Sequence, residues 1–331
     1  MPPSAETERG FESGEPLVSI VTPVLDRVDS IGMSLASVAA QTYPNIEHIV
    51  VDGGSTDGTV DAIRSFADLH PLRWLSESDG GMYEAINKGF SLARGEVMAY
   101  LNSDDIYLPW SVDIVVETLR AGSDFAYGDL GVIRGPNDRR TFMPEFYAPF
   151  DLNHYAYFRN LGQPTVFWRR AAYEDLGGFD ESYRLLGDCE FWLRAGARGY
   201  SFAHVSEVVA VQFDHAETLR RKHRDQLREE FGRLRDTHRG AAGKPARFGS
   251  VRTALGWRAR FARFYIASRW GGARSWSQFI SWFDANSLPR HSKVLLRLLP
   301  ARVWPRGLSF TDADELCRRL QGDLSSLGNL R

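Results

Sequence analysis

LVSIVTPVLDR, residues 17–27, is the stretch that decides the fold class of this chain. Its first eight residues form a largely apolar run rich in β-branched side chains, which is typical of a strand buried on both faces of a sheet. Three further strand-like runs follow: IEHIVVDGG (46–54), LRWLSES (72–78) and EVMAYLN (96–102). The sequence between and after them has helical spacing over residues 31–41, 58–68, 82–93 and 109–120. This alternation predicts an α/β domain with a mostly parallel central sheet flanked by helices.

Shorter strands and a charged helix are expected farther along the chain. DFAYGDL (124–130) and the stretch through Phe142 indicate short strands, with turns at Gly128-Asp129 and at residues 135–137. Further strands are indicated over residues 163–170 and 200–213, a turn over 173–181 and a helix over 188–199. Residues 215–239 are highly charged and predict a solvent-exposed amphipathic helix. Its apolar side would carry Leu219, Leu227, Phe231 and Leu234.

Composition predicts a three-part chain in a reducing compartment. We assign residues 1–15 to a disordered leader, 16–214 to a catalytic domain, and 215–331 to a C-terminal helical, basic and aromatic-rich region. The leader lacks the basic and then apolar pattern of a signal peptide, and no run approaches the roughly 20 apolar residues of a membrane span. Cys189 and Cys317 cannot form a disulfide framework. We therefore expect a cytoplasmic protein.

The segment 247–306 is strongly basic and rich in tryptophan. It carries twelve Lys and Arg residues against one acid, Asp284, and contains five tryptophans. Such a segment suits an anionic lipid surface and would place the protein peripherally on the cytoplasmic face of the membrane. The same side chains could instead pack on the acidic catalytic domain, and the sequence leaves both interpretations open. Nucleic acid is not an expected partner, because no known binding module is present, and the oligomeric state stays open.

Polar side chains follow each of the four predicted strands. The carboxyl ends of parallel strands meet at one edge of an open α/β sheet, where ligands bind. Any one of these acids could be a helix cap or a turn residue, but four such positions in series predict an acidic crevice. The residues are Thr22 and Asp26 at the first strand, Asp52 at the second, Asp79 at the third, and Asn102, Ser103, Asp104 and Asp105 at the fourth.

Two stretches at this edge allow a specific chemistry and an ordinary structural interpretation. The neighbouring carboxylates of Asp104 and Asp105 repel each other unless a cation such as Mn²⁺ or Mg²⁺ neutralises them, but both could also cap the next helix. The glycines of VDGGSTDGT (51–59) would let a loop approach a ligand closely, and they are equally adequate in a simple turn. The dinucleotide fingerprint GxGxxG and the Walker A motif are absent, which argues against nicotinamide, flavin and P-loop enzymes.

Five motifs together resemble the inverting glycosyltransferases of family two, which have the GT-A fold. They occur in the order and spacing of that family, and the resemblance extends from Leu17 to about Phe213, some 60% of the chain. The motifs are SIVTPVLDR (19–27), VVDGGSTDGT (50–59), SDGGMYEAINKGFSLARGE (78–96), YLNSDD (100–105) and GQPTVFWRRAAYEDLGGFDESYRLLGDCEFWLR (162–194).

Carried over by position, the resemblance implies a donor site for a nucleotide-diphosphate sugar. Thr22 and Pro23 would line the base pocket, and Asp52 would contact a uracil-type ring. Asp104 would face the ribose or the diphosphate, and Asp105 would bind Mn²⁺ or Mg²⁺ as the cofactor. The remaining donor-side candidates are Asp26, Gly53, Asp79, Gly80, Lys88, Asn102 and Ser103.

The resemblance also implies a base and an acceptor side. Asp188, in GDCEFWLR, stands at the family's catalytic Asp and would deprotonate the acceptor hydroxyl, with Glu190 as the fallback. The family often has Glu before this Asp, where this chain has Gly187, so a supporting acid is in doubt. Without the resemblance, Asp188 is simply an acid near a helix N-terminus. The other candidates are Gln163, Trp168, Trp192 and Glu190 for the acceptor and His215 for the metal.

These features together predict a nonprocessive inverting glycosyltransferase of surface polysaccharide or glycolipid synthesis. The donor would be a nucleotide sugar, with UDP-sugar preferred, and the acceptor a glycan or a lipid-linked glycan. The chain lacks the QxxRW motif and the membrane helices of the family's processive synthases. Two alternatives are a catalytically inactive nucleotide- or glycan-binding assembly partner and a nucleotidyltransferase.

Overall fold

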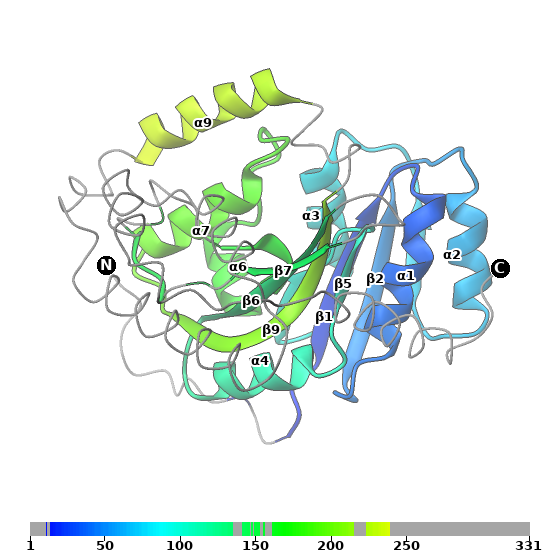
Figure 1. The fold of residues 1–331 in the computed structure, drawn as a ribbon, viewed down its shortest axis with the longest axis horizontal. Coiled ribbons are helices and arrows are strands. Elements are labelled where there is room, and N and C mark those ends of the chain that lie inside the picture. Colours follow the sequence, from blue (N-terminus) through cyan, green and yellow to red (C-terminus); the bar gives the residue numbers. More distant parts are fainter. Residues whose placement is uncertain are drawn as a thin grey trace, which may run out of the picture.

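The structure is a computed structural model that describes residues 11, 14–134, 141–145, 147, 149–152, 155, 161–214 and 223–238. The predicted leader lies almost entirely outside these residues, and the basic segment 247–306 lies entirely outside them. The described chain forms a central sheet covered by helices (Figure 1). None of its described helices has the length and apolar character needed to cross a membrane.

One sheet of nine strands runs through the described part of the molecule in the order β3-β2-β1-β4-β8-β6-β9-β5, with β7 paired to β6. The four strands β3-β2-β1-β4 are parallel to one another, and they are the four strands predicted from the sequence. The rest is mixed, because β8 is antiparallel to β4 and β6, whereas β9 is parallel to β6. The strands are β1 (Val18–Val24), β2 (Ile46–Asp52), β3 (Arg73–Ser76), β4 (Val97–Tyr100), β5 (Asp105–Tyr107), β6 (Phe125–Arg134), β7 (Thr141–Glu145), β8 (Val166–Arg169) and β9 (Phe202–Asp214).

Helices cover both faces of the parallel strands. Successive strand residues point to opposite faces, so Val24 and Val50 pack with α1 and α2, whereas Val21 and Val51 pack with α3. Every residue of β1 is buried, as the continuous apolar run predicts. The helices are α1 (Val28–Ala39), α2 (Thr59–Ala67), α3 (Met82–Leu92), α4 (Ser111–Arg120), α6 (Arg170–Leu176), α7 (Gly187–Ala197), α9 (Arg224–His238) and the short 3₁₀ helix η1 (Gln163–Thr165).

Several local predictions are wrong, and one of them is the turn expected over residues 173–181, because residues 173–176 lie in α6. Gly128-Asp129 is not a turn: β6 continues through it, and the register against β9 shifts there as in a β-bulge. Gly128 is needed because a Cβ at this position would lie 2.6 Å from a methyl of Val209. Another difference is β5, which starts at Asp105, where the sequence predicts no strand. The other expected turn, at residues 135–137, lies outside the described residues.

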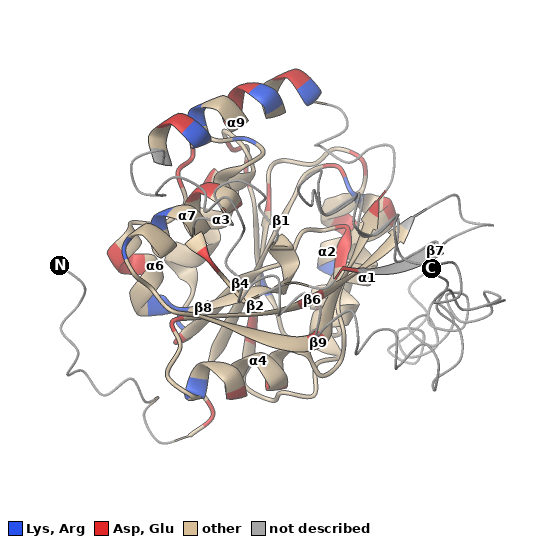
Figure 2. Ribbon diagram, turned by 60° about the vertical axis from the view of Figure 1, so that its left-hand side comes forward, with Lys and Arg blue, Asp and Glu red and all other residues tan. Residues whose placement is uncertain are grey.

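The charged helix after β9 is present as α9, but it is not simply a solvated helix. Leu234 is 2% exposed and belongs to the main core, and Leu227 packs against that core. Glu230 is also buried, whereas Phe231 is exposed. Leu219 lies outside the described residues. Figures 1 and 2 show α9 lying along α7 at one side of the molecule, so this part of the predicted C-terminal region packs against the predicted catalytic domain.

Candidate active site

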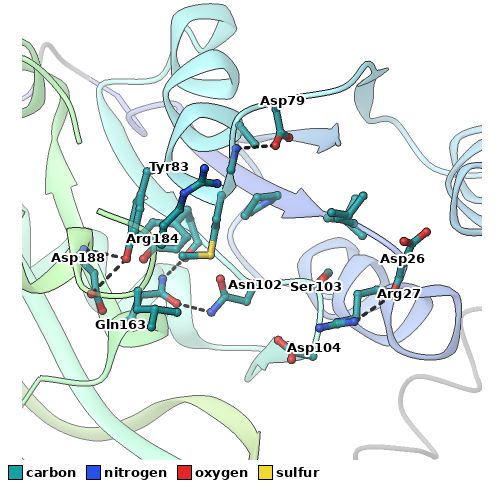
Figure 3. Close-up of a pocket in the computed structure, with 18 of the residues that line it drawn as sticks. Asp26, Arg27, Asp79, Tyr83, Asn102, Ser103, Asp104, Gln163, Arg184 and Asp188 are labelled. Carbon is teal, nitrogen blue, oxygen red and sulfur yellow. Dashed lines mark hydrogen bonds between the residues drawn. The ribbon is translucent and has the colours of Figure 1, made fainter. Parts of the chain in front are cut away.

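A cleft of about 890 Å³ lies at the carboxyl ends of the parallel strands. Residues 23–27 of its wall form the end of β1 and the loop after it, Asp79 follows β3, and residues 102–104 follow β4. Figure 3 shows two groups of labelled side chains, which we call the β1 end (Asp26, Arg27 and Asp104) and the α7 end (Tyr83, Arg184 and Asp188). The acidic crevice predicted from the strand ends is therefore present, and it also contains two arginines.

The loops after β1 and β2 are tied together beside the β1 end. The Asp26 backbone N–H donates to Ser55 Oγ at 2.8 Å, and the Thr56 N–H donates to Asp26 Oδ1 at 2.9 Å. Asp26 has a φ of 49°, a left-handed conformation that is uncommon outside glycine, although Asp tolerates it better than most residues. The sequence predicted Asp26 at this edge, and the structure places it on the cleft wall.

Two predicted base-contacting residues lie behind the wall of the cleft instead of on it. Asp52 is fully buried, and its Oδ2 accepts hydrogen bonds from the N–H groups of Gly54 and Ser55 and from Ser76 Oγ, at 2.6–3.1 Å. Thr22 is also fully buried, with its Oγ1 2.9 Å from His48 Nε2. Neither residue lines the cleft, and Asp52 holds the loop after β2 in place. Their direct contact with a base stays a prediction.

Asp79 reaches the wall because glycine leaves room for it. Its Oδ1 accepts a hydrogen bond from the Gly81 N–H at 2.9 Å, and burial raises the pKa of its carboxyl above the ordinary value. A Cβ on Gly53 would lie 2.8 Å from Asp79 Oδ2, so the lack of a side chain at Gly53 lets the Asp79 carboxylate lie against its backbone. The Gly80 N–H donates to Glu84 Oε2 at 2.7 Å. Lys88, predicted near the donor, pairs instead with Glu77 at 2.8 Å and is not on the cleft wall.

The two neighbouring acids after β4 have different environments. Asp104 lies on the cleft wall, whereas Asp105 starts β5 and is 1% exposed. Asp105 Oδ2 accepts a hydrogen bond from Asn102 Nδ2 at 3.1 Å. Burial, together with the neighbouring Asp104 carboxylate, raises the pKa of Asp105 well above its usual range. Asp104 therefore lines the cleft and Asp105 does not, and metal binding by either residue stays a prediction.

Gln163, which was predicted on the acceptor side, lies on the same wall of the cleft. Its Nε2 donates to the Tyr100 carbonyl at 2.8 Å, and its Oε1 accepts from Asn102 Nδ2 at 2.9 Å. Asn102, Ser103 and Gln163 all line the cleft, as the sequence predicted. This chain of hydrogen bonds fixes the strand-end segment that carries Asp104.

Asp188 lies at the α7 end of the cleft, near the start of α7 as predicted. It is 3% exposed, and the Tyr83 hydroxyl donates to its Oδ1 at 3.3 Å. The same hydroxyl oxygen accepts the Asp188 backbone N–H at 3.1 Å. Gly187 makes this contact possible, because a Cβ there would lie 2.7 Å from the Tyr83 ring. A tyrosine therefore occupies the space next to the acid where a Glu was expected by resemblance.

Three acceptor-side predictions are not supported by the structure. Trp168 and Trp192 are fully buried with ring centroids 5.4 Å apart, and neither lines the cleft. They complete an aromatic core and have no free face for a sugar ring. Glu190 forms a two-point ion pair with Arg194 at 2.7 and 2.9 Å, which accounts for its carboxylate without any role as a base. His215 lies outside the described residues.

Several cleft residues were not found by sequence reasoning. Tyr83, Arg27 and Arg184 line the cleft, and so does Gln226 of α9. The signal for Tyr83 was present, since it lies inside the motif SDGGMYEAINKG, but nothing in the spacing indicated which of its residues faces Asp188. Arg184 and Gln226 are brought to the cleft by long-range packing, which single-sequence patterns do not encode.

The described residues of the cleft suit a divalent cation that is held together with a ligand. The described residues contain no group of three or more His, Cys, Asp or Glu side chains arranged to hold a metal. Mg²⁺ and similar hard cations are commonly held by one or two protein carboxylates plus substrate phosphates. One wall carboxylate, Asp104, next to open cleft volume fits that mode of binding.

Comparisons with known proteins agree on one family. A family model described as Glycosyl transferase family 2 matches residues 19–174. The chain is 30% identical over 204 residues to a PGL/p-HBAD biosynthesis glycosyltransferase of Mycobacterium tuberculosis, which covers 60% of this chain and 77% of that protein. It is 31% identical over 195 residues to an uncharacterized glycosyltransferase of the same organism, covering 54% of this chain and 69% of that protein.

Solved structures share the fold. Residues 1–349 of S. aureus TarS, in complex with UDP-GlcNAc, match with a TM-score of 0.56 at 17% identity, over 94% of this chain and 89% of that one. The mannosyltransferase PcManGT from Pyrobaculum calidifontis, in complex with GDP-Man and Mn²⁺, matches with a TM-score of 0.54 at 18% identity, over 95% and 86%. These similarities confirm the predicted GT-A-type α/β fold.

Proposed function

The chain belongs to glycosyl transferase family 2, and from this premise we propose that it is a nonprocessive inverting transferase that uses a nucleotide-diphosphate sugar. The observation that carries the proposal is Asp188. This buried carboxylate lines the same cleft as Asp104, and Figure 3 shows Asp188 at the α7 end and Asp104 at the β1 end. Within this cleft of about 890 Å³ we place the donor diphosphate at the β1 end, the acceptor at the α7 end and the sugar between them.

The proposed reaction is a single displacement at the anomeric carbon. The acceptor oxygen forms the new bond to that carbon from one face while the bond to the diphosphate oxygen breaks on the other, and the nucleoside diphosphate leaves. Asp188 takes the proton of the acceptor hydroxyl, and the Tyr83 hydroxyl holds the carboxylate in place. Asp26, Asp79 and the loop fixed by Asp52 would contact the base and ribose side of the donor.

Asp104 would hold a Mn²⁺ or Mg²⁺ ion together with the donor diphosphate. Such an ion supplies charge stabilisation for the leaving nucleoside diphosphate. The cationic side chains of Arg27 and Arg184 line the same cleft and favour an anionic ligand there.

The acceptor is proposed to be a glycan or a lipid-linked glycan. Support comes from the sequence of the segment 247–306, whose basic and aromatic composition suits a lipid surface on the cytoplasmic side of a membrane. UDP-sugar is the preferred donor. Because the two structural neighbours carry UDP-GlcNAc and GDP-Man, a donor panel should contain both bases.

The test of this function is nucleotide release from a donor panel with Mn²⁺ and with EDTA, for the wild type and Asp188→Asn. We expect release of a nucleoside diphosphate that needs Mn²⁺ and falls at least about a hundredfold in Asp188→Asn, which is the usual share of a general base. Donor affinity by calorimetry should stay within about threefold, because the base does not hold the nucleotide. Asp61→Asn, an exposed acid on α2, is the matched control and should keep full activity.

Other outcomes would separate the alternatives. Release of pyrophosphate instead of nucleoside diphosphate would indicate a nucleotidyltransferase. Binding without turnover of any donor and acceptor pair would indicate an inactive binding protein. Full activity of Asp188→Asn would reject the base assignment. In Asp104→Asn, nucleotide affinity should weaken in Mn²⁺ but not in EDTA if Asp104 holds the ion.

A further inference from the structure

Glu230 is a buried acid far from Asp188 in sequence whose carboxylate binds the chain just before α7. The residue is 6% exposed and lies on α9. Its Oε1 accepts the Arg184 backbone N–H at 2.8 Å, and its Oε2 accepts those of Leu185 and Leu186, each at 2.9 Å. Three consecutive backbone donors therefore converge on one carboxylate.

The three backbone N–H groups that bind Glu230 belong to the residues just before Asp188, the proposed base, in the sequence. Backbone N–H groups before a helix have no partner within the helix, and a carboxylate placed there satisfies them and interacts favourably with the helix dipole. Helix α7 starts at Gly187, and Asp188 is its second residue. Glu230 therefore fixes the segment whose direction sets where the Asp188 side chain enters the cleft. The same segment carries Arg184, which lines the cleft.

Helix α9 is held against the rest of the domain by an ion pair, a ring contact and a core residue, so Glu230 has a fixed position relative to the segment before α7. Arg233 Nη2 lies 3.1 Å from Asp180 Oδ2, and the Arg233 guanidinium stacks 3.9 Å from the centroid of the Tyr183 ring. One turn from Glu230, Leu234 is part of the main core. Figure 2 shows the helix as an alternation of basic and acidic residues, and of its described acids Glu230 alone is buried.

We propose that Glu230 is a positioning residue for sugar transfer, acting through the backbone of residues 184–186 to place Asp188 and Arg184 at the α7 end of the cleft. The proposal rests on the proposed function, since it assumes that Asp188 meets the acceptor. It also makes α9, a helix outside the region matched by the family model, part of the catalytic unit.

The experiment compares Glu230→Gln with Glu229→Gln in the full chain. The amide of Gln keeps one acceptor oxygen and turns an NH₂ group toward backbone N–H donors, so at least one of the three hydrogen bonds is lost. Glu229 is the adjacent and exposed acid on the same helix, so the control removes the same charge. We expect Glu230→Gln to lower kcat about 10- to 100-fold, because small displacements of catalytic groups have effects of this size. Affinity for UDP with Mn²⁺ should change less than about threefold.

The outcomes distinguish this inference from the function on which it rests. If the wild type turns over no donor in the panel, the proposed function fails. If the wild type is active and Glu230→Gln has wild-type kcat, or loses kcat and nucleotide affinity equally, the inference is overturned. A reduced kcat with retained affinity, at a temperature where both proteins are folded, supports it.

A second measurement covers the case in which Glu230→Gln does not fold. Hydrogen–deuterium exchange on the wild type should show the amides of residues 184–186 protected although they lie in no helix or strand. Exchange as fast as in exposed loops would overturn the proposal. Glu230→Asp, which keeps the charge on a shorter side chain, should fold, expose these amides partly and give an intermediate kcat. Full protection together with full activity in that variant would also count against the inference.

Discussion

The contact between Tyr83 and Asp188 shows how a missing side chain is replaced by a distant one. Gly187 has no side chain where the family often has Glu, and the Tyr83 ring fills that space, since a Cβ would come within 2.7–2.9 Å of it. The two residues in contact are 105 positions apart in the sequence. The doubt about a supporting acid that the sequence raised is therefore answered by a hydroxyl from α3, which no local pattern could have indicated.

Loss of the Tyr83 hydroxyl should reduce transfer without removing it. In Tyr83→Phe the ring still fills the space beside Gly187, but the Asp188 carboxylate loses a hydrogen bond and the Asp188 backbone N–H loses its acceptor. One such hydrogen bond is worth about 1–1.5 kcal/mol, so we expect kcat to fall at least about tenfold. Steady-state kinetics with a saturating donor would measure it. Tyr173→Phe is the control, because its hydroxyl also donates to a side chain, that of the half-buried Asn87, but lies outside the cleft. Equal kcat in both variants would show that the contact has no role in transfer.

For single residues, the sequence predicted which acids lie near the carboxyl ends of the strands, but it did not show which of them line the cleft. Asp26, Asp79, Asp104 and Asp188 all line it, as expected from the strand ends and the resemblance. Thr22 and Asp52 lie within β1 and β2, where contacts inside the sheet layers and the loop consume their polar atoms. The difference between Asp104 and Asp105 depends on where β5 begins, which a three-residue strand does not reveal in a sequence.

Among the elements, α3 packs closely against the sheet, and a glycine allows this close approach. Gly89 of α3 faces β1 and β2, and a Cβ there would lie 2.5 Å from Val21 Cγ1 and 3.2 Å from Val51 Cγ2. Valine methyl groups on a strand cannot rotate away cheaply, because χ1 is restricted by branching at Cβ. The position of α3 matters for the site, since it carries Tyr83.

Two Gly→Ala substitutions in helices should have opposite effects on stability. Gly32→Ala in α1 meets no atom within 4 Å, so it should stabilise the protein by about 0.5–1 kcal/mol through helix propensity. Gly89→Ala gains the same propensity but overpacks α3 on the sheet, at a cost of about 1–3 kcal/mol that outweighs it. Urea unfolding followed by circular dichroism would measure both. Stabilisation by Gly89→Ala would contradict the close packing described for this helix.

The elements themselves were largely predictable where hydrophobic patterns are long. The runs at residues 17–24, 46–54, 72–78 and 96–102 became β1 to β4. β1, β2 and β4 are buried along nearly their whole length, as expected of inner parallel strands, whereas β3 is a partly exposed edge strand. The exception at Gly128-Asp129 has a physical reason: Gly-Asp is a strong turn signal, and here the glycine serves close strand packing and a bulge. The Gly-Asp pair has the same local chemistry in a turn and in a strand with a bulge, and tertiary contacts decide which of the two forms.

On the scale of the whole molecule, the sequence predicted the catalytic core and misjudged how its last helix is used. The predicted boundary at residue 214 follows the change to a charged composition, yet α9 places Leu234 in the main core and Glu230 against the chain before α7. A charged helix has one buried acid only because three backbone donors meet it there, and single-sequence periodicity does not register such contacts. The role of the segment 247–306 stays a prediction, since it lies outside the described residues.

Burial of a neutral histidine in the sheet makes the stability of the whole domain depend on pH. His48 of β2 is 6% exposed, and burial lowers its pKa to about 3 from the ordinary value near 6.5. Between these values the unfolded chain binds a proton that the folded chain does not, so this contribution to stability is complete above about pH 6.5 and is lost as the pH falls. At pH 5 the loss should be about 2 kcal/mol, from 1.36 kcal/mol for each pH unit below 6.5.

Urea unfolding at pH 7.5 and pH 5.0 tests this expectation when the wild type is compared with His48→Gln. Gln keeps a polar partner for Thr22 Oγ1 but does not titrate, so the variant should lose about 2 kcal/mol less than the wild type between the two pH values. Contributions from carboxyl groups are common to both proteins and cancel in this difference. His70→Gln, at a half-buried histidine outside the sheet, should follow the wild type. If His48→Gln and the wild type lose equal stability, His48 takes up its proton in the folded state, and the interior around β1 and β2 must then be more accessible to water than its packing indicates.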